Sequence, residues 1–355
     1  MKRKKQDFVS LLSLWYKKNK RTLSFRNTKD PYLIWLSEVI LQQTQMSTGL
    51  VYFKKFKKKF PTLKSLSEAK EDDVIKKWEG LGYYNRAKNL HATAKYINQK
   101  LGGNFPNTKK NLIKLKGIGQ YTSSAIASIC FNEKTPAIDG NAYRVFSRVF
   151  GIKKDISSST SYSLFYKKSL KFIKKVNSPG EYNQSIMDFG SIQCVPKNPV
   201  CDICVLKKIC YAFINSEQEF LPVKKRLVKT TNRYFYYLLF NHLNNYLVKK
   251  RKKKDIWRGL YDFYLIEKKQ PTKNISGLVY KVFKHNIKNQ KKNIFHKKTR
   301  LSHQKIHITF INIPLNKKKD FNKLKNELDL ISLHKKDLAL IAKPKVINDY
   351  LKKIF

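Results

Sequence analysis

The stretch that decides the fold is LKGIGQYTSSAIASI, at residues 115–129. Gly117 and Gly119 interrupt the helical spacing of its apolar residues, which predicts a tight Gly-Ile-Gly turn between two amphipathic helices. Glycines let the backbone approach a phosphate, and the N-terminus of the second helix directs N–H groups toward an anion. Such turns also simply join helices. Because Lys114 and Lys116 flank this one, contact with a DNA backbone is as well supported as a purely structural role.

The composition supports a globular protein with an anionic partner. The 355 residues suggest two domains, and a hydrophobic content of 41% is enough to form cores despite a net charge of +51. Nucleic acid is the commonest partner for a protein this basic. However, 64 of the 75 basic residues are Lys, a bias that codon drift in an AT-rich genome also produces. The charge alone therefore identifies no function.

The pattern of apolar residues changes along the chain, from helical spacing to runs rich in aromatic and β-branched residues. Residues 1–215 predict an all-helical domain, residues 216–232 a linker, and residues 233–355 a smaller α+β domain. The helices expected in the first domain are Asp7–Asn19, Pro31–Gln45, Leu63–Trp78 and Arg86–Gln99. The strands expected in the second domain are RYFYYLLF, GLYDFYLIE and KIHITFINI, and helical spacing returns from Asp337 onward. The predicted fold class is mainly α.

The N-terminus imitates a signal peptide, since MKRKK precedes the apolar FVSLLSLWY. Asp7 interrupts this pattern, and no small-residue cleavage site follows. The spacing of Phe8, Leu12 and Trp15 favours an amphipathic helix instead. No run of 18 apolar residues occurs, so we expect no membrane span and a cytoplasmic location.

Four cysteines form a compact cluster with the spacing C-x6-C-x2-C-x5-C: Cys194, Cys201, Cys204 and Cys210. In a cytoplasmic protein such a set predicts a metal site, because disulfides do not persist there. Tetrahedral zinc and a 4Fe-4S cluster both remain open, with the wide first loop favouring the bulkier cluster. The fifth cysteine, Cys130, is expected to be a small buried hydrophobic residue.

Two carboxylates are candidates for catalysis. Asp139, in TPAIDGNAYRVFSR, lies twenty residues beyond the glycine turn at the start of a predicted helix, where an acid is ordinarily an N-cap. Glu38, in PYLIWLSEVILQQTQ, shares its helix face with Ile34 and Trp35. Burial there disfavours the charge and raises the pKa, as a general acid requires. An ordinary N-cap at Asp139 and a Glu38 paired with a basic residue stay open as alternatives.

The hairpin, the acid twenty residues later and the cysteine loop together resemble the endonuclease III superfamily of DNA glycosylases. The strings LSEVILQQTQ, GLGYYNRAKNLH, IDGN and YNQSIMDFG are similar to its adenine glycosylase branch, the MutY family. The resemblance extends over nearly the whole chain. It implies a helix-hairpin-helix domain with a 4Fe-4S cluster loop, followed by a Nudix-like domain.

The resemblance also implies the chemistry. Bifunctional members carry a lysine just after the hairpin that attacks the sugar. Gln120 and Tyr121 stand there in this chain, which implies a monofunctional enzyme. In this family Glu38 would be the acid that protonates N7 of a flipped adenine. Asp139 would stabilise the sugar cation, as paired carboxylates do in glycoside hydrolysis.

Further residues match family positions that contact the substrate. The resemblance implies that Gln43 and Tyr83 fill the space vacated by the base or wedge beside its partner. The implied lining of the adenine pocket and its carboxylates is Arg26, Tyr121, Asn141 and Gln184. Phe25 replaces the usual Trp, a mild departure.

The second domain resembles the part of the family that reads 8-oxoguanine opposite the adenine. Ser302 and His303 match the family's Phe-Ser-His loop, whereas Leu301 lacks the aromatic ring. No G-x5-E-x7-REUxEE run occurs, so pyrophosphohydrolase activity is not expected.

The implied partner is double-stranded DNA that contains A:8-oxoguanine or A:G mispairs, bound by a monomer associated with the nucleoid. Two alternatives stay open: a glycosylase of the same fold with another base preference, and a DNA-binding iron–sulfur protein that has lost catalysis.

Overall fold

The computed structural model describes residues 2–225, 230–253, 255–283, 294–301 and 303–355. The chain divides into two compact units, one formed by residues 1–69 with 89–226 and the other by residues 70–88 with 227–355. The division passes through one helix and assigns a short segment of the helical region to the second unit. The predicted domain limits stay predictions, and residues 226–229 of the predicted linker lie outside the described residues.

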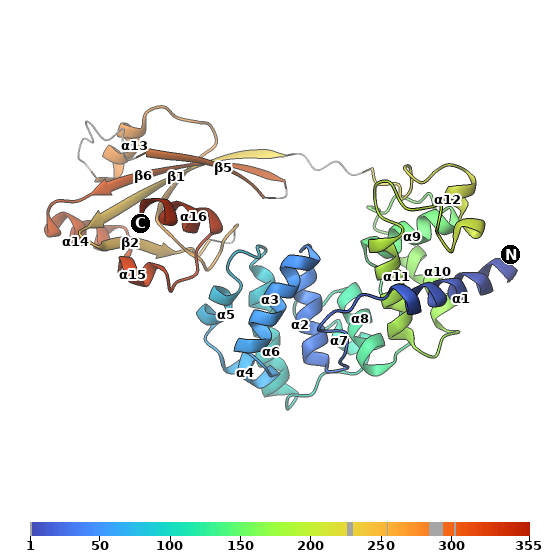
Figure 1. The fold of residues 1–355 in the computed structure, drawn as a ribbon. Coiled ribbons are helices and arrows are strands. Elements are labelled where there is room, and N and C mark those ends of the chain that lie inside the picture. Colours follow the sequence, from blue (N-terminus) through green and yellow to red (C-terminus); the bar gives the residue numbers. More distant parts are fainter. Residues whose placement is uncertain (1, 226–229, 254, 284–293, 302) are drawn as a thin grey trace. The chain divides into compact units, whose positions relative to one another are not determined.

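The first unit is built from helices (Figure 1). They are α1 (Lys2–Asn19), α2 (Pro31–Leu41), α3 (Met46–Lys59), α4 (Leu63–Glu68), most of α6 (Asn85–Lys100), α7 (Lys109–Leu112), α8 (Gln120–Phe131), α9 (Gly140–Phe150), α10 (Ser161–Ile173), α11 (Pro179–Ile192), the 3-10 turn η1 (Lys207–Ile209) and α12 (Tyr211–Ile214). Helix α5 (Glu71–Lys77) belongs to the second unit.

Helix α1 confirms the amphipathic pattern and begins earlier than expected, at Lys2. Its apolar stripe is buried against α9, α10 and α11. Phe8 packs on Phe146 with ring centroids 5.7 Å apart, and Trp15 meets Phe189 edge-on at 5.0 Å. Rings at these distances gain attraction beyond the burial of their area. The apolar part of the segment that imitated a signal peptide, from Phe8 onward, is therefore part of a packed core.

Two helix boundaries differ from the prediction. The helix expected over Leu63–Trp78 is wrong, because Ala69 and Lys70 are extended and divide it into α4 and α5. Thr62 and Ser65 form a capping box that starts α4, and the acids of the first turn of α5 suit the positive end of a new helix dipole. The helix expected over Pro31–Gln45 ends at Leu41, before a turn in which Gln43 has a φ of +53°.

The second unit contains a seven-stranded mixed sheet, and its aromatic and β-branched runs predicted strands there. The order β3-β2-β1-β6-β5 forms its main path, with β4 paired to β1 and β7 to β2. The strands are β1 (Thr231–His242), β2 (Asn245–Lys250), β3 (Tyr261–Asp262), β4 (Tyr264–Lys268), β5 (Ile294–Leu301), β6 (Gln304–Pro314) and β7 (Ile331–His334). Strands β1 and β6 run parallel, and the other pairs are antiparallel.

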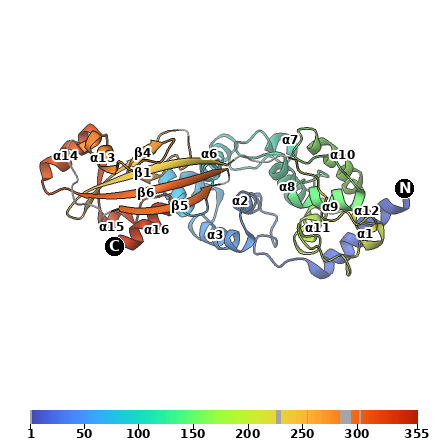
Figure 2. The ribbon, with the colours of Figure 1, turned by 90° about the horizontal axis from the view of Figure 1, so that it is seen from above.

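Helices cover both faces of this sheet (Figures 1 and 2). They are α13 (Ile275–Phe283), α14 (Lys318–Glu327), α15 (Lys335–Leu338) and α16 (Lys345–Ile354). Successive residues of β1 point to opposite faces, so Phe235 and Tyr237 pack on α15 and α16 while Tyr236 and Leu238 pack on α13 and α14. The result is a three-layered α/β/α unit.

Residues 70–88 are joined to this unit by polar contacts. Glu79 accepts from the backbone N–H of Lys343 at 2.7 Å and from Lys76 Nζ at 2.6 Å, and Lys250 pairs with Asp72 at 2.5 Å. In the described part of the chain, no helix has the length and apolar character needed to cross a bilayer.

Candidate active site

Glu38 lies on α2, between the buried residues Ser37 and Val39. Part of its surface stays accessible, but the protein atoms around the carboxyl desolvate it and raise its pKa to about 7. The Tyr121 hydroxyl lies within hydrogen-bond reach and, with the charge of Arg26, opposes this rise, whereas the charge of Asp139 adds to it. The carboxyl is thus poised to hold or release a proton near neutral pH.

Asp139 is the N-cap of α9, as the ordinary interpretation of an acid in this place predicted. Its carboxylate accepts from the backbone N–H of Ala142 at 2.7 Å and from Asn141 Nδ2 at 2.7 Å. Burial raises the pKa of Asp139, while these hydrogen bonds and the charge of Arg144 oppose the rise. Capping and a functional role are compatible, because the cap fixes the direction of the carboxylate.

The remaining residues of the expected adenine pocket are distributed around these acids. Asn141 bridges Asp139 and Arg144, since its Oδ1 also accepts from Arg144 at 2.7 Å. The Tyr121 hydroxyl donates to Met187 Sδ at 3.5 Å. Gln184 Oε1 accepts from the Tyr16 hydroxyl at 3.1 Å, which ties α11 to α1. These three residues and Arg26 belong to the first unit.

Sequence reasoning missed Asp188, the buried partner of Arg26. The Arg26 guanidinium forms a two-pronged ion pair with this carboxylate, and Arg21 Nε donates to it at 2.6 Å. Burial disfavours the Asp188 charge, but the bonds and charges of Arg26 and Arg21 outweigh burial and lower its pKa. The sequence did offer a signal of a buried acid, because Asp188 lies among the apolar residues Ile186, Met187 and Phe189. Arg26 is therefore held in place by Asp188 while its charge acts on Glu38.

Gln43 and Tyr83, the two residues expected to enter the base stack, share an unusual backbone conformation. Their φ angles are +53° and +49°, in the left-handed region that side chains other than glycine rarely adopt. Gln43 is exposed, and Tyr83 is 51% exposed despite its large apolar ring. Strained backbone with an exposed side chain is typical of functional positions.

Tyr83 and His303 belong to the second unit, and the sequence places Ser302 there too. Ser302 lies outside the described residues, so its expected contact with the opposite base stays a prediction. His303 is exposed, and its carbonyl accepts from the backbone N–H of Thr231 at 2.9 Å, which joins β6 to the start of β1. Leu301 ends β5 and packs against the sheet core.

The hairpin predicted at residues 115–129 is present between α7 and α8. Gly117 has a φ of +81°, and a Cβ there would lie 2.7 Å from Asn89 Cβ, so only glycine fits. The Thr93 hydroxyl donates to the carbonyl of Lys116 at 2.7 Å and fixes the turn to α6. Gly119 is the N-cap of α8 and has no side chain to cap it. An uncapped helix N-terminus beside lysines can receive a phosphate oxygen.

The four cysteines gather on one side of α9. Cys194, Cys201, Cys204 and Cys210 line a single cavity together with Arg148 and Phe189. Burial raises the pKa of Cys204 to about 12, so ionised sulfurs need compensating positive charge. Among the residues that the structure describes, no three His, Cys, Asp or Glu side chains form a group that could hold one metal ion. In a 4Fe-4S cluster each thiolate binds a different iron, so its four sulfurs need not converge on one point.

Arg148, which sequence reasoning also missed, is the clearest sign of negative charge at this cavity. Its side chain is only 2% exposed and has hydrogen bonds to the carbonyls of Leu221, Val195 and Pro196. Its Nη1 lies 3.4 Å from Cys194 Sγ. A buried guanidinium requires an anionic partner, and thiolates bound to an iron–sulfur cluster would supply one. The residues present therefore fit such a group.

Arg144 connects the cysteine loop to one of the two candidate acids, Asp139. Its Nε donates to the carbonyl of Cys194 at 2.7 Å, and its Nη2 donates to Asn141 Oδ1 at 2.7 Å. Because Asn141 in turn donates to Asp139, three residues link the start of the cysteine loop to the cap of α9.

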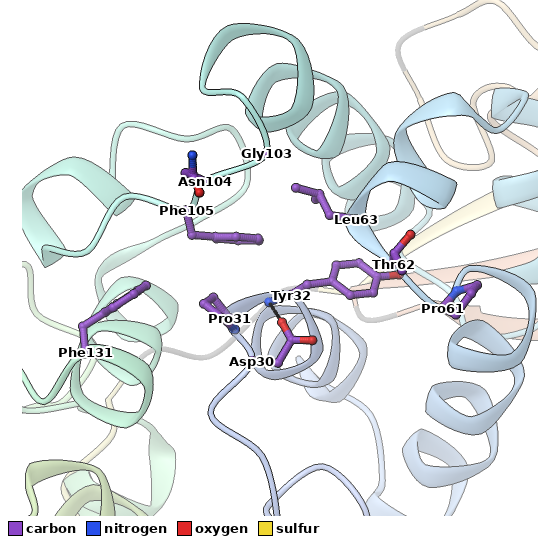
Figure 3. A pocket seen from close by; sticks show the side chains of 10 residues that line it. All are labelled: Asp30, Pro31, Tyr32, Pro61, Thr62, Leu63, Gly103, Asn104, Phe105 and Phe131. Atoms are coloured by element: carbon purple, nitrogen blue, oxygen red, sulfur yellow. Dashed lines mark hydrogen bonds between the residues drawn. The ribbon is translucent and has the colours of Figure 1, made fainter.

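The cavity drawn in Figure 3, of about 350 Å³, lies at the amino end of α2. Pro31, Tyr32, Leu63, Phe105 and Phe131 form most of its wall, and Asp30 is engaged as the cap that accepts from the Tyr32 N–H. Its lining includes none of the candidate site residues. The catalytic candidates and this cavity therefore occupy different parts of the first unit.

The comparisons with known proteins agree with this geometry. Residues 36–174, which contain the hairpin and both candidate acids, match the family model described as HhH-GPD superfamily base excision DNA repair protein. The chain is 34% identical over 351 residues to the adenine DNA glycosylase of Buchnera aphidicola subsp. Acyrthosiphon pisum, covering 98% of this chain and 99% of that one. It is also 38% identical over 219 residues to the human adenine DNA glycosylase, covering 59% of this chain and 40% of that one.

Solved structures show the same fold. A thermostable thymine-DNA glycosylase matches with a TM-score of 0.56 and 25% identity over 60% of this chain and 98% of that one. An endonuclease III in a non-covalent complex with DNA matches with a TM-score of 0.51 and 21% identity over 60% and 97%. The class is thus a helix-hairpin-helix DNA glycosylase of base excision repair. Within it, the chain belongs to the adenine DNA glycosylases, hydrolases that act on N-glycosyl bonds.

Proposed function

We propose that this protein excises adenine mispaired with 8-oxoguanine or guanine, by hydrolysis of the N-glycosidic bond and without strand cleavage. The single observation that carries the proposal is Glu38, whose pKa burial raises to about 7 beside Tyr121 and Asp139. The names of the relatives, adenine DNA glycosylases across bacteria and eukaryotes, support adenine as the base removed.

Glu38 is assigned the role of general acid. Adenine leaves its sugar more readily once N7 is protonated, and a carboxyl with a pKa of about 7 donates a proton without a large uphill step. The Glu38 carboxyl gives its proton to N7, the C1′–N9 bond breaks, and its electron pair leaves with the base. Tyr121 and Arg26 adjust the acidity of the carboxyl.

Asp139 is assigned the stabilisation of the sugar. Departure of the base leaves positive, oxocarbenium character at C1′, which an ionised carboxylate stabilises electrostatically. The hydrogen bonds from Ala142 and Asn141 favour the ionised form and hold the oxygens in place. Water then adds to C1′ and loses a proton, which completes hydrolysis.

The monofunctional character follows from the residues after the hairpin. Gln120 and Tyr121 begin α8, and neither carries an amine that could attack C1′. Without a covalent imine between protein and sugar, the abasic strand is released intact.

Opposite-base recognition is assigned to Ser302 and His303 in the second unit. A hydroxyl and an imidazole can form hydrogen bonds with the edge of 8-oxoguanine, which differs from guanine at O8 and N7, and the His303 imidazole is exposed. A 4Fe-4S cluster held by the four cysteines would stabilise the loop that presents Lys197, Lys207 and Lys208 to the duplex.

The proposal is tested with four duplexes that differ in one pair: A opposite 8-oxoguanine, A opposite G, A opposite T, and thymine glycol opposite A. We expect breaks at adenine in the first two duplexes, and only after alkali treatment. Breaks without alkali would contradict the monofunctional mechanism, and breaks at thymine glycol would indicate another base preference.

Glu38→Gln is the matched test of the acid. We expect a loss of excision of at least about 100-fold with duplex binding retained, because the amide has no proton to transfer at neutral pH. Glu68→Gln removes an exposed carboxylate of α4 and should leave the rate unchanged. Near-normal excision by Glu38→Gln under single-turnover conditions would exclude Glu38 as the acid.

The cluster has its own test. A broad absorbance band near about 400 nm would support iron–sulfur, because zinc gives no such colour. A colourless protein that contains stoichiometric zinc would contradict the assignment.

A further inference from the structure

The turn that carries Tyr83 lies between α5 and α6 and is held from within by two side chains. Three residues around it have left-handed backbones: Gly80, Gly82 and Tyr83, with φ of +93°, +77° and +49°. A non-glycine residue keeps such a conformation only where its surroundings enforce it. In this turn, Trp78 and Arg86 hold the backbone in that conformation.

The carbonyl of Gly82 is held by two side chains. It accepts from Nε1 of the buried Trp78 at 2.9 Å and from Nη2 of Arg86 at 3.2 Å. The same Nη2 lies 3.4 Å from the carbonyl of Leu81. One guanidinium thus contacts both carbonyls that immediately precede Tyr83.

The guanidinium of Arg86 also contacts two aromatic rings. The Arg86 guanidinium lies 5.1 Å from the centroid of the Trp78 ring and 5.6 Å from that of Tyr83. Such distances give attraction between a cation and the face of a ring. The backbone N–H of Arg86 also donates to the carbonyl of Tyr83 at 2.9 Å. Arg86 therefore touches the wedge candidate through both its main chain and its side chain.

We propose that Arg86 is a positioning residue that fixes the Gly82–Tyr83 turn and so presents a preorganised Tyr83 ring to the duplex. The inference rests on the proposed function, in which Tyr83 acts as a wedge during base extrusion. A ring already held in its working direction loses less conformational freedom when it enters the base stack. Arginine suits this position better than lysine, because its planar guanidinium can lie against the Trp78 and Tyr83 rings while its Nη2 contacts the two carbonyls.

The first test measures the turn itself. Arg86→Lys keeps the charge but removes the fork, and we expect backbone amides of residues 80–86 to exchange hydrogen at least about tenfold faster than in the wild type. Lys95→Ala, which removes an exposed charge from the same helix, should leave their exchange unchanged. Unaltered exchange in Arg86→Lys would overturn the inference, whatever the enzyme excises.

The second test is a double-mutant cycle on the complete protein with Arg86→Lys, Tyr83→Ala and the combined variant. Extrusion is followed by the fluorescence of 2-aminopurine in place of the target adenine, opposite 8-oxoguanine. We expect Arg86→Lys to slow extrusion about tenfold and Tyr83→Ala to slow it at least as much. The combined variant should match Tyr83→Ala, because a positioning residue acts through the residue it positions.

Two outcomes would overturn the inference. A full further tenfold loss when Arg86→Lys is added to Tyr83→Ala would show an independent role and overturn the inference. Normal extrusion by Tyr83→Ala would overturn it too, while leaving adenine excision by the wild type intact. If Arg86→Lys does not fold, Trp78→Phe removes the other donor to Gly82, and the same cycle is run with that variant.

Discussion

At the residue scale, Glu38 has the largest consequence, because burial of its ionised carboxylate lowers the free energy of unfolding. Its pKa of about 7 lies above the 4.5 of a free glutamate, so folding disfavours its ionised form. Active sites commonly accept such a loss of stability in exchange for a group of useful acidity. Burial also raises the pKa of Asp139, although hydrogen bonds oppose the rise, whereas the ion pair with Arg26 lowers the pKa of Asp188.

The first prediction concerns the pH dependence of excision. The acid form of Glu38 is the active one, and its population declines as the pH rises through about 7. Single-turnover excision of adenine opposite 8-oxoguanine should therefore slow about tenfold for each pH unit above 7. A rate that stays level or rises between pH 7 and 9 would argue against the assigned proton donor.

The second prediction concerns stability. The folded protein binds more protons than the unfolded chain between the unfolded pKa near 4.5 and the folded pKa of about 7. The Glu38 contribution to the free energy of unfolding therefore decreases as the pH rises through this window, by up to about 3 kcal/mol. Glu38→Gln should be more stable than the wild type at pH 8, and the difference should shrink toward pH 5.5. Urea unfolding at the two pH values measures it, and equal stability at both would refute the prediction.

At the scale of secondary-structure elements, the close approach of α9 and α11 positions the start of α9, where Asp139 is the N-cap. A Cβ on Gly190 would lie 2.6 Å from Asn141 Cβ and 3.1 Å from Asn141 Cα, so α11 has room only for glycine beside the start of α9. The link Arg144–Asn141–Asp139 depends on this approach.

The third prediction follows from this packing. Gly190→Ala should displace the N-terminus of α9, lower the free energy of unfolding by about 1–3 kcal/mol and slow excision. Gly140→Ala, at the first position of α9, meets no atom within 4 Å and serves as the control. Thermal unfolding and single-turnover rates should separate the two variants. Equal behaviour would show that the contact is unimportant.

At the scale of the whole molecule, the candidate residues are distributed over the two units. The first unit contains the candidate acids and the cysteine loop, and the second contains Tyr83 and His303. Base removal and opposite-base recognition should therefore be separable by mutation.

The fourth prediction tests this division. Ser302→Ala combined with His303→Ala should reduce the preference for 8-oxoguanine over guanine by about 5- to 100-fold, as expected for one or two lost base contacts. Excision opposite guanine should persist. Lys305→Ala, an exposed neighbour in β6, should keep the preference. Equal losses on both mispairs would contradict a role in reading the opposite base.

The fifth prediction concerns the charge of +51. Binding to an undamaged duplex should weaken by about 1,000-fold or more between 50 and 200 mM salt, as for proteins with several phosphate contacts. Lys116→Ala at the hairpin should reduce the slope of log affinity against log salt by about 1. An unchanged slope would place the hairpin away from the phosphates.

Much of the fold could be predicted because its signals are local. Helical spacing identified α1, the glycine pair identified the hairpin, and β-branched and aromatic residues identified β1 and β6. The helix expected over Leu63–Trp78 was wrong, because apolar periodicity continued across Ala69 and Lys70 where the backbone turns. Arg148 and the ion pair of Asp188 escaped notice, because the groups that bind these buried charges lie far away in the sequence.

The sequence by itself determined the candidate acids and the four candidate cysteine ligands, since these depend on residue types at particular positions, and its motifs resemble those of the class to which the chain belongs. Only the tertiary structure decided how those residues work together. It raised the pKa of Glu38 through burial, buried Arg148 beside Cys194, and joined Arg86 to the Tyr83 turn. These effects come from desolvation and from contacts between groups far apart in the chain, and neither is encoded in local spacing.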